Sequence, residues 1–160
     1  MKFIRTFSTV LARFFLSAVF LAGAVSKLFH WHESEKMLMN TLCDWQASLG
    51  FYETAQNCLA MVTPWTPLLL IAATLFEMVG GLLLLLGMKE KLGATLLILF
   101  LIPATLVMHA FWLHEGGVRE LQTIMFLKNL AILGGLFMVL LHGAQAKSGG
   151  DSSFSSMNLG

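Results

Sequence analysis

Charged residues are scarce in this 160-residue chain. Lysine and arginine together contribute 10 residues and aspartate and glutamate 9, so only 12% of the sequence is charged. A soluble domain carries about 25%. The formal net charge is +1, and the only basic cluster lies within the first 13 residues. This composition argues against a soluble globular protein and gives no support for nucleic-acid binding.

The motifs that mark common catalytic and metal centres are also missing from the sequence. It contains no glycine-rich phosphate loop, no nucleophile elbow and no Cys/His spacing typical of haem or iron–sulfur ligation. His30 and His32 are two positions apart, which does not place them on one helix face. We therefore expect no metal site, and the sequence leaves open whether the protein is an enzyme.

Long apolar runs are what the chain has in abundance. They cover Leu11–Phe29, Trp65–Gly87, Leu92–Leu113 and Leu121–Leu141. About 20 helical residues cross the hydrocarbon core of a bilayer. Because a backbone in lipid must satisfy its own hydrogen bonds, the four runs are predicted to be helices. The expected fold class is an all-α integral membrane four-helix bundle.

The long connection between the first two runs has its own pattern. Apolar residues recur in it at helical spacing, at Trp31, Leu38, Leu42, Trp45 and Leu49. This spacing predicts an amphipathic helix on the outer surface. Residues 1–142 are expected to form one membrane domain. Residues 143–160 are rich in glycine and serine and are expected to be a flexible cytoplasmic tail.

Two further features concern the helices themselves. Met88–Lys91 is too short for anything but a tight turn, so the second and third runs should form an antiparallel hairpin. Pro103 lies inside the third run and predicts a bend there, because proline removes a backbone donor.

The basic residues outside the runs are distributed unequally. Two of them, Lys36 and Arg119, fall on one side of the expected bundle, and the other side carries Lys2, Arg5, Arg13, Lys89, Lys91 and Lys147. The positive-inside rule then predicts that both termini are cytoplasmic and that the protein is a multi-pass protein of the inner (cytoplasmic) membrane.

The first run also has some features of a secretory signal peptide. It follows a basic segment, and Ala22, Gly23 and Ala24 resemble a small-residue cleavage site. The apolar run continues past this site to Phe29. We therefore expect a retained first helix, with cleavage as the alternative.

The two cysteines, Cys43 and Cys58, lie in the long outer connection. In an oxidising compartment they can form one structural disulfide. Two free thiols are an equally compatible state. The spacing is not that of a Cys-x-x-Cys redox motif, so a redox-active pair is the weakest of the three alternatives.

Each apolar run is interrupted by polar residues, namely Lys27, Glu77, His109 and the pair Lys128 and Asn129. Ionisable groups inside a membrane are costly and mark structural or functional contacts. Counted from the outer helix ends, these residues form a ladder with Glu77 near the midplane, and the stem of Lys128 is long enough to approach Glu77. The cluster is a lock on helix register, a ligand pocket for a headgroup such as a quinone, or a proton or ion pathway.

Four stretches that carry these polar residues resemble the DoxX family of small bacterial membrane proteins. They are FLAGAVSKL at Phe20–Leu28, FEMVGGLLLLLG at Phe76–Gly87, ATLVMHAFW at Ala104–Trp112 and FLKNLAILGGLF at Phe126–Phe137. The family takes its name from a small subunit of an archaeal thiosulfate:quinone oxidoreductase or terminal quinol oxidase complex. The long connection with two cysteines departs from the family's short forms.

The resemblance implies a membrane subunit or accessory factor of a quinone-linked redox system. It implies quinone as the candidate cofactor. The implied partners are the lipid bilayer and a membrane or periplasmic redox protein. It assigns no catalytic residue. The opposed hypothesis is a non-enzymatic scaffold or receptor that binds another membrane protein or a lipid.

Overall fold

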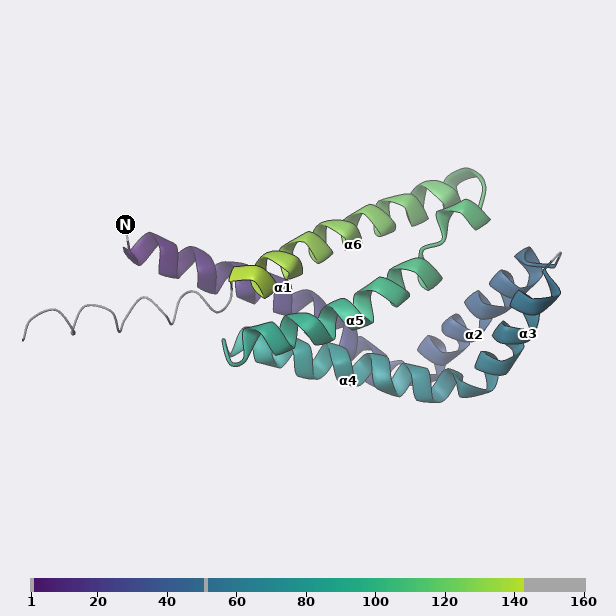
Figure 1. The fold of residues 1–160 in the computed structure, drawn as a ribbon, viewed down its shortest axis with the longest axis horizontal. Helices are drawn as coiled ribbons and strands as arrows, with labels where there is room; N and C mark the ends of the chain where they lie inside the picture. Colours follow the sequence, from purple (N-terminus) through teal and green to yellow (C-terminus); the bar gives the residue numbers. More distant parts are fainter. Residues whose placement is uncertain (1, 51, 143–160) are drawn as a thin grey trace, which may run out of the picture.

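The computed structural model describes residues 2–50 and 52–142, which form helices joined by short turns (Figure 1). The helices are α1 (Lys2–Phe29), α2 (Trp31–Ser48), α3 (Glu53–Val62), η1 (Thr63–Trp65), α4 (Thr66–Leu85), α5 (Glu90–Met108), η2 (Phe111–Leu113) and α6 (Gly116–His142). No strand occurs among these residues. The expected tail at 143–160 lies outside the described residues.

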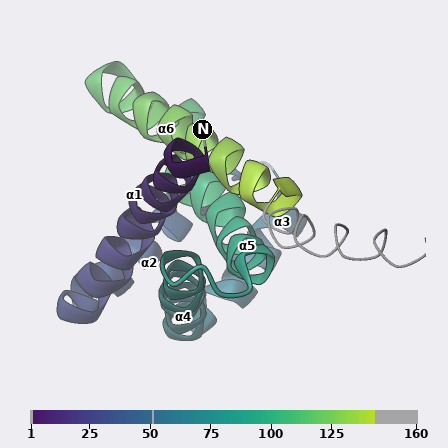
Figure 2. The same cartoon turned by 90° about the vertical axis from the view of Figure 1, so that its left-hand side faces the viewer.

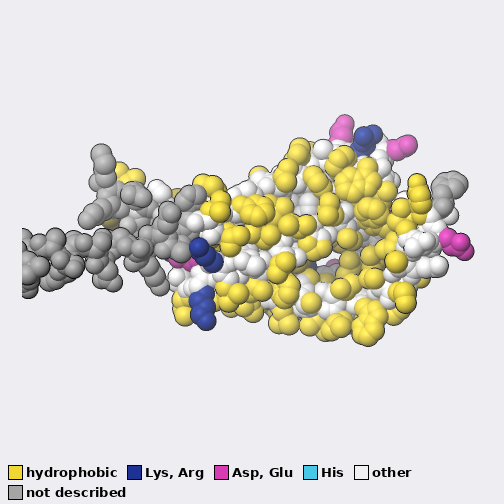
Figure 3. Space-filling view, in the orientation of Figure 1, with side chains coloured by type: hydrophobic (Ala, Val, Ile, Leu, Met, Phe, Trp, Pro, Cys, Tyr) yellow, Lys and Arg dark blue, Asp and Glu magenta, His cyan; other side chains and the backbone are white. Residues whose placement is uncertain are grey.

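Four stretches are long and apolar enough to cross a membrane: Thr6–Phe29, Glu53–Leu85, Glu90–Leu113 and Gly116–Leu141. Each overlaps one of the predicted apolar runs. On the face seen in Figure 3, apolar side chains cover the middle of the molecule, and the charged side chains gather at its two ends. The predicted all-α membrane bundle is thus confirmed.

A tight turn joins α4 to α5 as an antiparallel hairpin. Gly87 adopts φ +65° just after α4. The backbone N–H groups of Gly87 and Met88 donate to the carbonyls of Leu84 and Leu83, at 3.1 and 3.0 Å. These two hydrogen bonds form the Schellman motif, in which a glycine adopts the left-handed conformation that ends the helix.

Small residues let α4 and α5 approach closely. A Cβ on Gly80 would lie 2.7 Å from the Cγ of Leu97, and one on Gly93 would lie 3.0 Å from the carbonyl oxygen of Gly80. Lipid offers little hydrophobic drive between helices, so close packing of small residues supplies much of the association.

The core lies where all four long helices meet. Phe20, Leu84, Leu97 and Leu136 come from α1, α4, α5 and α6 respectively, and each is almost fully buried. Packing is sequential, with α1 on α4, α4 on α5 and α5 on α6. Figure 2 shows α1 and α6 diverging away from this meeting point. Gly135 of α6 still lies close to α1, because a Cβ added to it would lie 3.2 Å from the Cδ2 of Leu16.

The predicted amphipathic segment is a pair of helices, α2 and α3, that packs over the outer ends of α4 and α5 (Figure 1). Leu42 is buried against the bundle, and Trp45 and Leu49 are half-buried on the same face. The indole Nε1–H of Trp45 donates to the carbonyl oxygen of Val107 at 3.0 Å. We call α2 and α3 together the outer hairpin.

The helix α5 runs through Pro103 and ends at Met108, five residues before the predicted end at Leu113. His109 leaves the helical region with φ −121° and ψ 45°, and the N–H of Phe111 donates to the carbonyl of His109 at 2.9 Å. The last carbonyls of α5 are therefore left for partners outside the helix, which is where Trp45 bonds Val107.

Candidate functional site

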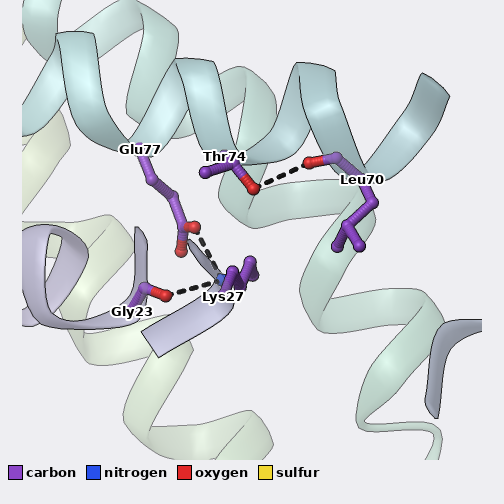
Figure 4. Close-up of polar contacts among 5 residues, drawn as sticks. All are labelled: Gly23, Lys27, Leu70, Thr74 and Glu77. Atoms are coloured by element: carbon purple, nitrogen blue, oxygen red, sulfur yellow. Dashed lines mark hydrogen bonds and ion pairs between the residues drawn. The ribbon is translucent and has the colours of Figure 1, made fainter. Parts of the chain in front are cut away.

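Glu77 and Lys27 form an ion pair between α4 and α1 (Figure 4). The Nζ of Lys27 lies 2.6 Å from the Oε2 of Glu77, and the two side chains are 24% and 6% exposed. The same Nζ lies 3.4 Å from the carbonyl oxygen of Gly23 and 5.5 Å from the ring centre of Phe100. A cation over an aromatic face gains electrostatic stabilisation. We call Lys27, Glu77 and Phe100 the ion-pair site.

Neighbouring residues shape this site without bonding its carboxylate. A Cβ on Gly23 would lie 3.1 Å from the Oε1 of Glu77, so glycine leaves room for the carboxylate against α1. Thr74, one turn before Glu77, donates its hydroxyl to the carbonyl of Leu70 at 2.8 Å (Figure 4). Within the described residues, Lys27 is the ion-pair partner of Glu77.

The predicted approach of Lys128 to Glu77 was wrong. Lys128 is exposed on α6, and its Nζ lies 3.2 Å from the Sδ of Met125. The cause is the packing order, because α6 packs on α5 and η2 and lies away from α4. Counting the depth of each polar residue from the outer helix ends is also valid only if those ends lie at the same level. In fact α1 ends two residues after Lys27, beside the middle of α4.

The other intramembrane polar residues form separate pairs. The Nδ2 of Asn129 donates to the Oγ1 of Thr105 at 3.1 Å, and Thr105 donates to the carbonyl of Leu101 at 2.6 Å. The Nδ1 of His109 lies 2.8 Å from the Oε1 of Gln122, at hydrogen-bonding distance. The single polar ladder expected from the sequence is therefore divided into three pairs and an exposed lysine.

Three partners in these pairs were missed by sequence reasoning: Phe100, Thr105 and Gln122. Thr105 and Gln122 are polar residues inside or at the edge of apolar runs, and that signal was present in the sequence. Phe100 is one aromatic residue among many, and nothing in its position distinguishes it.

Both cysteines are exposed free thiols in the structure. Cys58 lines a cavity under the outer hairpin, and Cys43 does not. A bridge between them stays a prediction that a non-reducing gel of protein from intact cells can test. Among the residues described, no three His, Cys, Asp or Glu side chains lie together as metal ligands would.

Two adjoining cavities lie between the outer hairpin and the outer ends of the bundle. The larger, of about 320 Å³, is lined by apolar residues of α2, α3 and α5, among them Leu42, Leu49, Leu59 and Leu106. The smaller, of about 120 Å³, is lined by polar Thr41, Asp44, His114 and Gln122 together with apolar residues such as Met108 and Leu113. Trp45 and Val107 line both, so the two cavities meet at these two residues.

Aromatic rings pack against Trp45, where the two cavities meet. Trp45 packs edge-on against Trp112 with ring centres 5.9 Å apart, and Trp112 contacts Phe111 at 5.0 Å and Phe126 at 6.1 Å. Edge-to-face pairs of this kind contribute about 0.5–1.5 kcal/mol each beyond burial. The outer hairpin is thus fixed to η2, which in turn packs on α6, as well as to α5.

The fold and its buried ion pair define a multi-pass α-helical membrane protein with internally paired polar groups. The DoxX family profile matches residues 8–110, from α1 to the start of η2. The chain therefore belongs to the DoxX family. No curated protein and no solved structure matches this chain.

Proposed function

We propose that this DoxX-family protein is a membrane subunit or accessory factor of a quinone-linked redox system. The ion-pair site is the observation that carries the proposal. It places a partly exposed ammonium group beside an aromatic ring within an otherwise apolar bundle. Ionisable residues within a membrane are functional candidates by default, because burying them is costly.

The chemistry of the ion-pair site fits a quinone ring. A lysine ammonium carries three donors. In the described structure its bonds go to Glu77 and, more weakly, to the carbonyl of Gly23. A quinone carbonyl can accept from the remaining donor, and the quinone ring can lie against Phe100. The site binds and orients the quinone, and the electrons come from a membrane or periplasmic redox partner.

The proposal includes a location. The protein lies in the cytoplasmic membrane with both termini in the cytoplasm, so the outer hairpin faces the periplasmic side. What supports this orientation is the excess of lysine and arginine at the end that carries the α4–α5 turn.

Quinone extraction tests the proposal. We expect protein purified from native membranes in mild detergent to carry quinone, detected by solvent extraction and mass spectrometry. The double variant Lys27→Met/Glu77→Gln removes both charges together and should lose the quinone. Lys128→Met is the matched control, because Lys128 is exposed and its Nζ contacts Met125 rather than Lys27 or Glu77. Equal quinone content in all three proteins, or none in the wild type, contradicts the proposal.

A specific observation also favours the scaffold alternative. Thr105 and Asn129 bond each other, as do His109 and Gln122, so these polar groups have structural partners. Meanwhile α1 exposes large apolar side chains along its first half, such as Phe3 at 83% and Phe7 at 59%. A membrane-protein partner recovered by mild purification from a preparation free of quinone supports the scaffold.

A further inference from the structure

We propose that the two cavities under the outer hairpin form one binding site for an uncharged membrane amphiphile. Its hydrogen-bonding head lies in the polar cavity and its apolar body in the apolar one. The site is separate from the ion-pair site, because the residues that line it come from α2, α3, η2, α6 and the end of α5. It does not depend on the function proposed above.

The apolar cavity is suited to the body of such a ligand. Its volume of about 320 Å³ falls at the lower end of the range for small-molecule pockets, about 300–1,000 Å³. Aliphatic side chains of Leu42, Leu49, Leu59 and Leu106 line it, together with the Trp45 indole. The cavity is open at the surface, so a longer tail can extend beyond it.

The polar cavity is suited to a small head. Thr41 and Asp44 of α2 face His114 and Gln122 across it. The Thr41 hydroxyl donates to the Met37 carbonyl, and the Oε1 of Gln122 lies 2.8 Å from the Nδ1 of His109. The Asp44 carboxylate can still accept from a ligand hydroxyl, and the Gln122 amide N–H groups can donate to a hydroxyl or carbonyl. The volume of about 120 Å³ leaves room for a small head only.

Trp45, where the two cavities meet, is held in place. Trp45 is fixed by its bond to the Val107 carbonyl at 3.0 Å and by its packing on Trp112. A fixed indole that borders both an apolar and a polar cavity favours a ligand that has an apolar and a polar part. Such preorganisation lowers the entropic cost of binding.

Charge decides which head the site accepts. Among the residues that line the two cavities, none is lysine or arginine, and Asp44 is an acid. An anionic phosphate head would find no cation there and would be repelled by the carboxylate. A hydroxyl or carbonyl head meets complementary partners instead. Membranes supply this chemistry as quinones or quinols and as acylglycerols.

The two cysteines provide an internal test. Cys58 lines the apolar cavity, whereas Cys43 is exposed outside it. The Cys43→Ser and Cys58→Ser proteins each retain one thiol. The rate at which maleimide labels that thiol is measured with and without a probe. The probe is either a fully substituted short-tailed benzoquinone or a monoacylglycerol. At a probe concentration about ten times its dissociation constant, labelling of Cys58 should slow about tenfold. Labelling of Cys43 should not change.

A cavity-filling variant gives a second readout. Ala55 of α3 lines the apolar cavity, and Ala60 on the same helix is exposed outside it. Ala55→Phe should abolish the rise in unfolding temperature that the probe produces, and Ala60→Phe should preserve it. Because both variants are tested without probe as well, loss of folding would be seen directly.

The outcomes distinguish a quinone-type ligand from an acylglycerol, and they also test whether the site exists. Protection by the benzoquinone alone identifies a quinone-type ligand, protection by the monoacylglycerol alone an acylglycerol, and protection by both a site for the shared chemistry. Absence of protection by either probe, equal protection of Cys58 and Cys43, or an unchanged response of Ala55→Phe overturns the proposal. None of these results depends on quinone at Lys27.

Discussion

The carboxylate of Glu77 lies inside an apolar bundle, and its stability there depends on one cation. An unpaired charge in hydrocarbon costs several kcal/mol, and a paired one much less. Lys27 supplies the charge, a hydrogen bond at 2.6 Å and a contact with Phe100. The pair therefore holds α1 against α4 in one register.

A double-mutant cycle measures this coupling. Lys27→Met and Glu77→Gln should each lower the free energy of unfolding in mixed micelles by about 2–4 kcal/mol, because each single change disrupts the pair. The double variant should recover much of the loss, since no charge is left buried. Lys128→Met should be within about 0.5 kcal/mol of wild type, as expected for an exposed residue. A coupling energy near zero between Lys27 and Glu77 would mean that they do not meet in solution.

At the scale of helices, small residues decide which faces approach. Gly80 and Gly93 bring α4 and α5 together, and Gly23 and Gly81 do the same for α1 and α4. Gly134 of α6 serves no such contact, since a Cβ there would meet no atom within 4 Å.

This difference predicts opposite effects of the same substitution. Gly80→Ala places a Cβ 2.7 Å from the Cγ of buried Leu97, so it should destabilise by about 1–3 kcal/mol through overpacking. Gly134→Ala should stabilise by up to about 1 kcal/mol, because alanine is the better helix former. Thermal unfolding in detergent compares the two. Equal effects would show that α4 and α5 are not in close contact at Gly80.

The outer hairpin is attached to the bundle by a bond that can be removed singly. Trp45→Phe keeps an aromatic ring but loses the Nε1–H that donates to Val107. The loss of one hydrogen bond costs about 0.5–1.5 kcal/mol. We expect faster amide hydrogen exchange in α2 and α3, with little change in α4 and α5. Trp65→Phe is the control, because Trp65 is 61% exposed. Unchanged exchange in Trp45→Phe would exclude this bond as the attachment.

At the scale of the whole molecule, charge is separated along the long axis. Arg13 of α1 bonds Glu90 at 2.6 Å and so lies beside the α4–α5 turn, next to Lys89 and Lys91. Arg119, by contrast, lies near the start of α6, at the opposite end of the span from His142. The positive-inside rule predicts that the more basic end lies in the cytoplasm.

Topology reporters test the orientation that follows. A fusion placed after Lys89 should report the cytoplasm, and one placed after Asp44 should report the outside. Replacing Lys89 and Lys91 with glutamine should weaken the preference, because it removes inner-side positive charges. A cytoplasmic signal from the Asp44 fusion would reverse the orientation and remove the oxidising compartment that a Cys43–Cys58 bridge requires.

The sequence by itself determined the fold class, the approximate positions of the four spans and an amphipathic helix in the outer connection, but not that this connection forms two helices. Length and hydropathy suffice for these features, because a bilayer admits only helices of about 20 apolar residues when the chain is all-α. It also marked the polar residues Lys27, Glu77, His109, Lys128 and Asn129, since each interrupts an apolar run, but it did not single out Thr105 and Gln122.

Only the tertiary structure decided how those residues pair. Hydropathy is nearly uniform around a membrane helix, so it does not specify which helices neighbour each other or how far one slides along another. In the structure α6 packs on α5, so Lys128 is exposed. Because α1 packs on α4, Glu77 pairs with Lys27 instead. The cavities under the outer hairpin have the same origin, because they lie between segments that are far apart in the chain and meet only when α2 docks on the end of α5.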